Sequence, residues 1–262
     1  GNVGLHKHLA ISSHITSGYS AKPLIKLLHS LINLQWLEEC TPKYLANATK
    51  VFINGTWIGV VTDPYVSMLT LRTYRRNALI PIYTSINWQI DVNCINIYTD
   101  SGRICRPLFY INQLNGEPSY MRKGIMDKLE GDDFTWEELI CGFSKKKDAN
   151  FNYDLLKIYP EVKDLYNTRN LESLTENQAV IEFIDSSEAS SSLVAVYDTQ
   201  LNKHPYTHIE IHPSLLYGVM GNQVVFPENN ASSRNVFACG QGKQAVSLYH
   251  SNFQVSFFSH NF

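Results

Sequence analysis

The chain has 262 residues, of which 44% are hydrophobic and 18% are charged. A chain of this length and apolar content can bury a sizeable core in one or two domains, which excludes disorder throughout. Its 22 Lys and Arg residues and 24 Asp and Glu residues leave a formal net charge of −2. This balance excludes a protein that coats nucleic acid with a globally basic surface, so any nucleic-acid contact must come from a local cluster.

The cysteines predict reduced thiols, and neither a disulfide framework nor a zinc site built on paired cysteines. Their number is odd, their spacing is wide and no CxxC pair occurs among Cys40, Cys94, Cys105, Cys141 and Cys239. No apolar run approaches the ~20 residues that span a bilayer, and no signal-peptide pattern opens the chain. We therefore expect an intracellular, soluble protein of the cytoplasm or nucleus.

The first part of the chain predicts a helix, a hairpin and a second helix. Leucines recur at three- and four-residue spacing from Pro23 to about Glu39, which predicts a helix with Ser20 as a candidate cap. The Asn54–Gly55 pair lies between β-rich runs and predicts a hairpin over 51–61. Asp63–Pro64 then has the pattern of a cap and first residue of a helix that ends in arginines.

The middle of the chain predicts a second strand–turn–strand unit and further helices. Ile95–Thr99 and Ile104–Tyr110 flank the turn Asp100–Arg103. The pattern over Tyr120–Leu129 is helical, and Thr135 with Glu138 forms a capping box that begins a short helix.

The last part begins with a polar stretch over Lys145–Glu176, which we interpret as a solvated insertion with a helical piece at Leu155–Tyr166. The serine-rich segment Ser186–Ser192 predicts a loop between two strands. The strands predicted in this part are Val180–Ile184, Leu193–Tyr197 and Tyr206–Ile211, and an apolar, glycine-punctuated run follows at Val219–Phe226. These patterns predict an α+β fold of several small modules without one large sheet.

One candidate metal site lies on a predicted strand. His208, Glu210 and His212 are spaced at i, i+2 and i+4, so they share one face of a strand. Two imidazoles and a carboxylate are acceptable zinc or iron ligands. The alternative is that they hydrogen-bond the backbone at a strand end, since no separate third ligand segment is evident.

A candidate phosphate site lies near the end of the chain. Gly240–Lys243 resembles the end of a phosphate-binding loop, but Phe237 stands where that loop needs a Gly and Gln244 where it needs Ser or Thr. The P-loop interpretation therefore fails. Arg234 and Lys243 still supply a planar fork and a point charge suited to phosphate, and the alternative is a solvated loop that runs into an amphipathic helix.

A candidate basic patch comes from Arg72, Arg75 and Arg76, which share a helix face, together with Arg103 and Arg106. It would suit nucleic acid or an acidic partner, and the alternative is a solvated helix end that complements the helix dipole. No paired-carboxylate site, nucleophile elbow, dinucleotide loop or cluster of three aspartates stands out.

Six sequence segments resemble motifs of the second-largest subunit of multisubunit DNA-directed RNA polymerases. They occur in the family's order and extend along nearly the whole chain. They are Gly4–Ile15 (fork region), Lys50–Val60 (VNGxWxG hairpin), Leu71–Arg76 (LRxxRR helix), Tyr98–Leu108 (TDxGRxxRPL turn), Thr207–Ser214 (ExHPS) and Phe226–Ala245 (PFPxHNQSPRN…GKQA). The sequence is rich in Asn and Ile, and in this respect it resembles the form of the subunit found in large nucleocytoplasmic DNA viruses.

The resemblance implies an α+β fold of small modules with mixed short antiparallel sheets and helices. The implied modules are the end of the fork (1–45), a first external domain (46–125), a second external domain with the polar insertion (126–203) and the start of the hybrid-binding domain (204–254). The family's protrusion, lobe, wall, anchor and clamp have no counterpart, so the chain resembles a central piece. Residues 255–262 depart from the family, and we interpret them as an intron or frame change in a split gene.

Roles are implied for four residues near the C-terminal end. In the family, the Arg of SPRN projects toward the triphosphate of the incoming nucleotide, and that position is Arg234, preceded by Ser233 in place of Pro. The family's Tyr three residues on is Phe237 here, without the hydroxyl. The family's GKQ approaches the growing RNA end, which implies RNA contacts for Lys243 and Gln244.

The implied enzyme is a nucleotidyltransferase that works only when assembled. The family's Mg-binding aspartates lie in the largest subunit, so we expect no catalytic residue and no metal ligand in this chain. His208, Glu210 and His212 then become structural, and the arginine helix becomes external-domain surface.

The implied partners are the largest and other polymerase subunits, the DNA template, the RNA–DNA hybrid and nucleoside triphosphates. The implied location is a viral factory in the host cytoplasm, the nucleus or the virion. Two alternatives stay open: a non-catalytic interaction module that docks on other polymerase subunits, and a metalloenzyme that uses His208, Glu210 and His212.

Overall fold

The computed structural model describes residues 4–5, 7–112, 116–122, 125, 130–131, 135–142, 174–175, 177–202 and 204–246. The chain divides into two compact units, which we describe separately. One unit is Ser13–Ile211, and the other combines Gly1–Ser12 with His212–Phe262. Helices and small mixed sheets occur together, so the predicted α+β class is confirmed.

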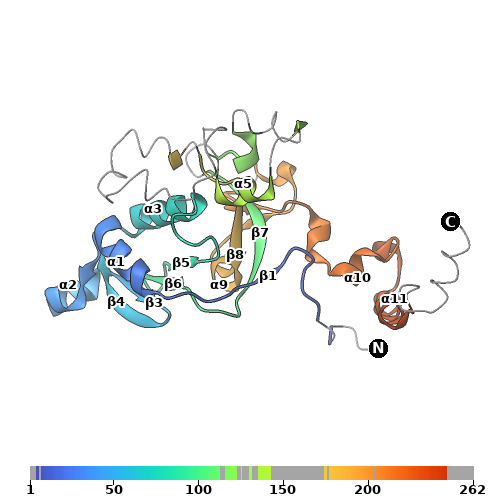
Figure 1. Cartoon of the computed structure of the whole chain (residues 1–262), viewed down its shortest axis with the longest axis horizontal. Helices are drawn as coiled ribbons and strands as arrows, with labels where there is room; N and C mark the ends of the chain where they lie inside the picture. The colour runs from blue at the N-terminus through green and yellow to red at the C-terminus, as the bar shows by residue number, and fades with distance from the viewer. Residues whose placement is uncertain are drawn as a thin grey trace, which may run out of the picture. The chain divides into compact units, whose positions relative to one another are not determined.

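The unit Ser13–Ile211 contains a first five-stranded sheet with the order β2-β4-β3-β6-β5 (Figure 1). Its strands are β2 (Gln35–Trp36), β3 (Thr49–Ile53), β4 (Thr56–Val61), β5 (Ser85–Gln89) and β6 (Cys94–Tyr98). Strands β3 and β6 run parallel and the other neighbours run antiparallel. The predicted hairpin is confirmed, because Asn54 and Gly55 join β3 to β4 with φ of 49° and 81°, the pair of positive values that a type I′ turn requires.

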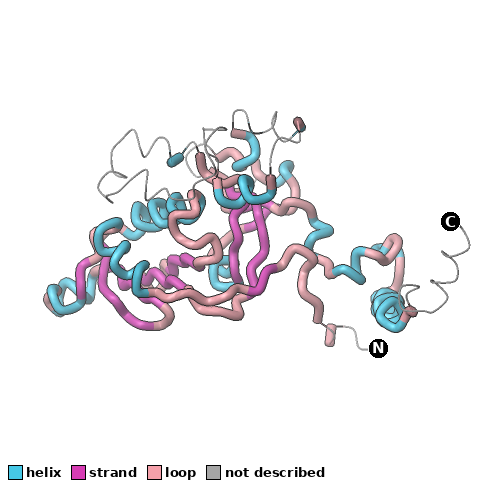
Figure 2. Tube along the Cα trace, in the orientation of Figure 1, coloured by secondary structure: helices cyan, strands magenta, loops and turns pink. Residues whose placement is uncertain are grey.

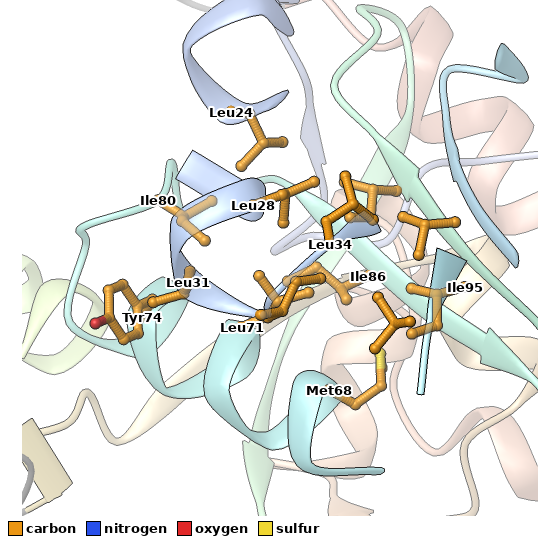
Figure 3. Close-up of a cluster of buried hydrophobic side chains, with 14 of the residues drawn as sticks. Leu24, Leu28, Leu31, Leu34, Met68, Leu71, Tyr74, Ile80, Ile86 and Ile95 are labelled. Atoms are coloured by element: carbon orange, nitrogen blue, oxygen red, sulfur yellow. The ribbon is translucent and has the colours of Figure 1, made fainter. Parts of the chain in front are cut away.

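Two helices pack on this sheet and bury its main hydrophobic core. Helix α1 (Lys22–Leu31) and helix α3 (Pro64–Arg76) are amphipathic. Figure 3 shows leucines of α1 and residues Met68 and Leu71 of α3 in one cluster with Ile86 and Ile95 of the sheet. The prediction that the first helix extends to about Glu39 is wrong. The helix ends at Leu31 because Asn33 adopts the left-handed φ of 51°, after which β2 and a 3₁₀ turn, η1 (Leu37–Glu39), follow.

The N-terminal ends of these helices differ in detail from the predicted caps. Ala21 occupies the cap position of α1, and Ser20 accepts only a 3.4 Å hydrogen bond from the Lys22 backbone N–H. Asp63 does occupy the cap position of α3, as predicted, but its side chain makes no capping bond. A short helix, α2 (Pro42–Asn47), leads into β3.

The second sheet is built around one long strand, β7 (Ile104–Tyr110). Strand β8 (Ile181–Asp185) pairs antiparallel along one edge of β7, and the other edge is shared by β1 (His14–Ile15) and β10 (His208–Ile209). Strand β9 (Val194–Ala195) extends the sheet parallel to β10. Figure 2 shows β7 and β8 as adjacent strands.

The predicted strand–turn–strand unit is only half right. Both strands form, but β6 belongs to the first sheet and β7 to the second, so the turn Asp100–Arg103 connects two sheets instead of closing a hairpin. The turn is held in place by Thr16, whose hydroxyl donates to the Asp100 carbonyl at 3.1 Å. The same hydroxyl oxygen accepts from the Arg103 backbone N–H at 3.0 Å.

Two further predictions concern helices beside the second sheet. The capping box of Thr135 and Glu138 is confirmed, and it begins α5 (Trp136–Cys141). The predicted loop Ser186–Ser192 is wrong in its first part, because Ser186–Ser190 forms a helix, α9, whose Glu188 backbone N–H donates to the Asp185 carboxylate. The 3₁₀ turns of this unit are η2 (Ser119–Met121) and η3 (Asp198–Gln200).

Some predicted elements fall outside the described residues. These are most of the helix predicted over Tyr120–Leu129, the insertion with its helical piece at Leu155–Tyr166 apart from residues 174–175, and the tail 255–262. No helix in the described part of the chain combines the length and apolar character that a membrane crossing needs.

The smaller unit consists of short helical turns and one longer helix. Its elements are η4 (Pro213–Leu216), α10 (Val219–Asn222), η5 (Pro227–Asn229) and α11 (Ser232–Gln244). The N-terminal segment lies along it, since the Ile11 backbone N–H donates to the Tyr217 carbonyl at 2.9 Å. Helix α11 includes Gly240–Lys243, so the stretch that resembles a phosphate loop is helical.

Candidate functional site

Helix α11 carries all four residues for which nucleotide and RNA contacts are implied. Arg234 and Phe237 lie in its first two turns, and both are exposed, Phe237 by 60%. Lys243 and Gln244 are exposed in its last turn. The structure thus places the four residues on one element, where the guanidinium of Arg234 is open to solvent.

The geometry of an α-helix separates these residues into two groups. At 100° per residue, Arg234 and Phe237 lie about 60° apart around the axis, whereas Lys243 lies about 180° from Arg234 and about 14 Å along the axis. Gln244 returns to within about 80° of Arg234. Arg234 and Lys243 therefore suit two different groups of a ligand and not one phosphate.

A cavity of about 630 Å³ lies beside the Lys243 face of α11. Its wall includes Lys7 and His8 of the N-terminal segment, Tyr217 and Gly218 before α10, and Lys243. The chain packs closely at Gly218, where a Cβ would meet the Leu9 carbonyl oxygen at 3.1 Å. The volume falls within the range of ligand pockets.

Asn235 supplies an unsatisfied polar atom in the wall of this cavity. Its side-chain NH₂ donates to the Pro227 carbonyl at 2.9 Å, while its buried Oδ1 has no hydrogen-bond partner. A buried acceptor without a partner costs stability, so it marks a place where a donor from a ligand or partner fits. Asn235 lies within the segment that resembles the SPRN motif, but the sequence analysis assigned it no role.

The predicted basic patch on α3 is wrong, and so is the expectation that the arginine helix is surface. Arg75 is only 1% exposed. Its Nη1 donates to Glu188 Oε2 at 2.7 Å and its Nη2 contacts Glu182, while Arg76 Nη2 donates to Glu182 Oε2 at 2.9 Å. Burying an arginine is costly unless a carboxylate compensates its charge, and the carboxylates that bind Arg75 and Arg76 come from β8 and α9.

Two other arginines of the predicted patch, Arg103 and Arg106, are also paired with carboxylates. Arg103 Nη1 lies 3.2 Å from Asp185 Oδ2, and Arg106 contacts Glu210. Sequence reasoning missed the acidic partners Glu182, Asp185 and Glu188. A usable signal was present, because two of these carboxylates interrupt the apolar strand Ile181–Asp185.

The predicted metal ligands His208, Glu210 and His212 are each engaged with other protein groups. His208 is buried beside the Thr207 hydroxyl, Glu210 pairs with Arg106, and His212 Nδ1 accepts from the Ser214 backbone N–H at 3.1 Å. No group of three or more His, Cys, Asp or Glu residues in the described part of the chain could hold a metal ion. The structural alternative for these three residues fits their contacts.

The His208 environment makes stability depend on pH. Burial, followed by the charge of Arg72, lowers the pKa of His208 to about 3. The imidazole is therefore neutral in the folded protein, and its 3.8 Å approach to Glu182 is not an ion pair near neutral pH.

We expect His208 to lower the free energy of unfolding as the pH falls below about 6.5, the pKa of histidine in the unfolded chain. Between that pH and about 3, the unfolded state binds a proton on this imidazole that the folded state does not bind. At about pH 5 the free energy of unfolding should be lower by about 2 kcal/mol than at about pH 8 from this group alone. Urea unfolding of the wild type and His208→Gln at both values tests this. A variant that loses as much stability as the wild type on acidification contradicts it.

Comparison with known proteins supports the resemblance to the second-largest polymerase subunit that the six sequence motifs indicated. Residues 51–112, from β3 to just beyond β7, match the sequence family described as RNA polymerase Rpb2, domain 4. The chain is 32% identical to DNA-directed RNA polymerase II subunit RPB2 of Schizosaccharomyces pombe over 96% of its own length and 21% of that protein. The chain is homologous to the second-largest subunits of DNA-directed RNA polymerases.

Other polymerase subunits match over nearly the same share of the chain. DNA-directed RNA polymerase III subunit RPC2 of S. pombe is 29% identical over 93% of the chain and 18% of that protein. DNA-directed RNA polymerase subunit 2 of Acanthamoeba polyphaga mimivirus is 25% identical over 96% of the chain and 20% of that protein. The chain thus spans about a fifth of the length of these polymerase subunits.

Proposed function

We propose that the chain forms part of the second-largest subunit of a DNA-directed RNA polymerase and acts in template-directed RNA synthesis. The homology to such subunits over 96% of the chain carries this proposal. In the assembled enzyme, the chain would meet the largest subunit, the other subunits, the DNA template and the RNA–DNA hybrid. Such an enzyme works wherever its DNA is transcribed, in the nucleus, in a cytoplasmic viral factory or in the virion.

Helix α11 would provide the nucleotide and RNA contacts. The exposed guanidinium of Arg234 would bind the triphosphate of the incoming nucleotide and neutralise the charge that develops on the leaving pyrophosphate. Phe237, one turn away, would pack nearby, and Lys243 with Gln244 would contact the backbone of the growing RNA end. The separation of Arg234 from Lys243 along the helix supports two such different contacts.

Magnesium would be held mainly by the largest subunit, where it would activate the RNA hydroxyl and stabilise the phosphate charge. In this chain, binding and orientation of phosphate by arginine and lysine would be the contribution to catalysis.

The proposed modules are the end of the fork (1–45), two external domains (46–125 and 126–203) and the start of the hybrid-binding domain (204–254). Exposed apolar side chains in the smaller unit, among them Tyr217, Val219, Val225 and Phe226, support docking of other parts of the enzyme there. The same observation favours the alternative in which the chain is an interaction module without substrate contacts.

Purification from the cells or virions that make the chain tests the proposal. We expect the largest polymerase subunit to copurify and the complex to synthesise RNA from nucleoside triphosphates on a DNA template. Depletion with an antibody to this chain should remove that activity, whereas an unrelated antibody should not. A chain that purifies alone, from fractions whose RNA synthesis survives its depletion, contradicts the proposal.

A further inference from the structure

A second cavity, of about 540 Å³, lies within the unit Ser13–Ile211 and is separate from the proposed polymerase contacts. One wall is the face of α3 that carries Tyr65, Leu69, Arg72 and Arg76 at helical spacing. The opposite walls come from the end of β7, from η2 and from the residues around β10. Three of its lining residues are arginines: Arg72, Arg76 and Arg122.

The carboxylates near this cavity are already engaged with other arginines. Arg75 holds both oxygens of Glu188, at 2.7 and 3.0 Å, and Glu182 is shared between Arg75 and Arg76. The acidic residue among the lining residues is Glu117, which is exposed. Arg72 therefore lies near a network in which the carboxylates of Glu182 and Glu188 hydrogen-bond Arg75 and Arg76 and not Arg72.

Arg72 has an enclosed donor without a partner. Its Nε is enclosed in the protein and has no hydrogen-bond partner. Burial is the main cause that lowers the pKa of Arg72, ahead of the opposing charge of Glu188. An enclosed donor without a partner weakens a fold, because it has lost its hydrogen bond to water without gaining another.

The other donors around the cavity are held in place by the backbone. Arg122 Nη2 donates to the Gln178 carbonyl at 2.7 Å and to the Ala179 carbonyl at 3.1 Å. The guanidinium of Arg76 stacks on the Tyr110 ring, with 3.6 Å from its central carbon to the ring centroid. Ser119 and Thr207 also line the cavity, and their hydroxyls donate to the Val180 and Leu193 carbonyls.

We propose that this cavity binds a phosphate-type oxyanion, with Arg72 as the principal ligand. A tetrahedral oxyanion would accept hydrogen bonds from the planar fork of Arg72 and would be attracted by its positive charge. The cavity exceeds the size of a phosphate ion, and Tyr65 and Leu69 give it an apolar side, so a phosphate monoester with a small organic group fits best.

Calorimetry and thermal unfolding of the full chain test the site, with inorganic phosphate and phenyl phosphate as probes and chloride at equal ionic strength as the blank. We expect saturable binding and a rise in Tm with both probes. Arg72→Gln should weaken binding at least tenfold, and Arg72→Lys should weaken it less, because a lysine keeps the charge without the fork. Lys26→Gln removes an exposed charge on α1 and should bind like the wild type.

The comparison of the two probes identifies the source of the anion. Tighter binding of phenyl phosphate assigns a phosphate ester, and equal affinities assign the free anion. Without phosphate, Arg72→Gln should be at least as stable as the wild type, because an uncompensated buried charge has been removed. The proposal is overturned if neither probe binds saturably, or if the wild type and the three variants bind the probes equally. It is also overturned if Arg72→Gln is unfolded without phosphate, because Arg72 would then be a structural residue.

Discussion

Replacing Arg75 with alanine should lower the free energy of unfolding by about 3–5 kcal/mol, the usual cost of removing one partner from a buried ion pair. Arg75 is among the largest fully buried side chains and binds Glu182, Glu188 and the Thr84 carbonyl. Without it, Glu188 keeps a buried carboxylate with no guanidinium on either oxygen. Urea unfolding of the full chain measures the loss.

The control for this prediction is Lys26→Ala, which removes an exposed charge and should change stability by less than about 0.5 kcal/mol. A second variant, Arg75→Met with Glu188→Gln, removes the charge of both partners. It should recover part of the loss, because a buried carboxylate is no longer left without a partner. A loss below about 1 kcal/mol for Arg75→Ala would show that the buried network contributes little to the stability of the fold.

Replacing Arg234 with alanine should slow elongation and raise the apparent KM for nucleotide in the assembled polymerase. Donors that are already positioned where charge develops supply about 2–4 kcal/mol of transition-state stabilisation, so kcat/KM should fall by about 30- to 1,000-fold. The isolated chain should keep its stability, because Arg234 is exposed. Single-nucleotide incorporation by the reconstituted enzyme gives both constants.

The matched control on the same helix is Gln241→Ala, an exposed residue of α11 outside the proposed contacts. It should leave elongation unchanged, and Arg234→Lys should retain part of the activity as a point charge without the fork. Unchanged kinetics for Arg234→Ala, in an enzyme that still contains the chain, would favour the interaction module without substrate contacts.

The sequence predicted those elements whose determinants are local. The Asn54–Gly55 turn and the Thr135 capping box are each decided by two to four neighbouring residues, and both form as expected. The separation of β6 and β7 into different sheets was not predictable in this way, because it depends on strands that lie far away in the sequence. The same holds for α1, whose leucine spacing continues to Leu34 although the backbone turns at Asn33.

Prediction of the candidate site from sequence has a similar limit. Arg75 meets Glu188 across 113 residues of sequence, so charge counting along α3 alone predicted a surface patch where there is a buried network. The four residues proposed for nucleotide and RNA came from family motifs, since the spacing on α11 alone suggested only phosphate affinity. The cavity beside Arg72 combines segments far apart in the chain, and no short pattern predicts it.

Helix α11 has thirteen residues, none of them buried. Isolated helices of this length are marginal in water, and burial of one face normally supplies most of their stability. The helix that presents Arg234 would thus gain its stability only when neighbouring protein covers it. Subunit assembly would then also form the substrate-binding helix. An unassembled subunit would therefore bind nucleotides weakly.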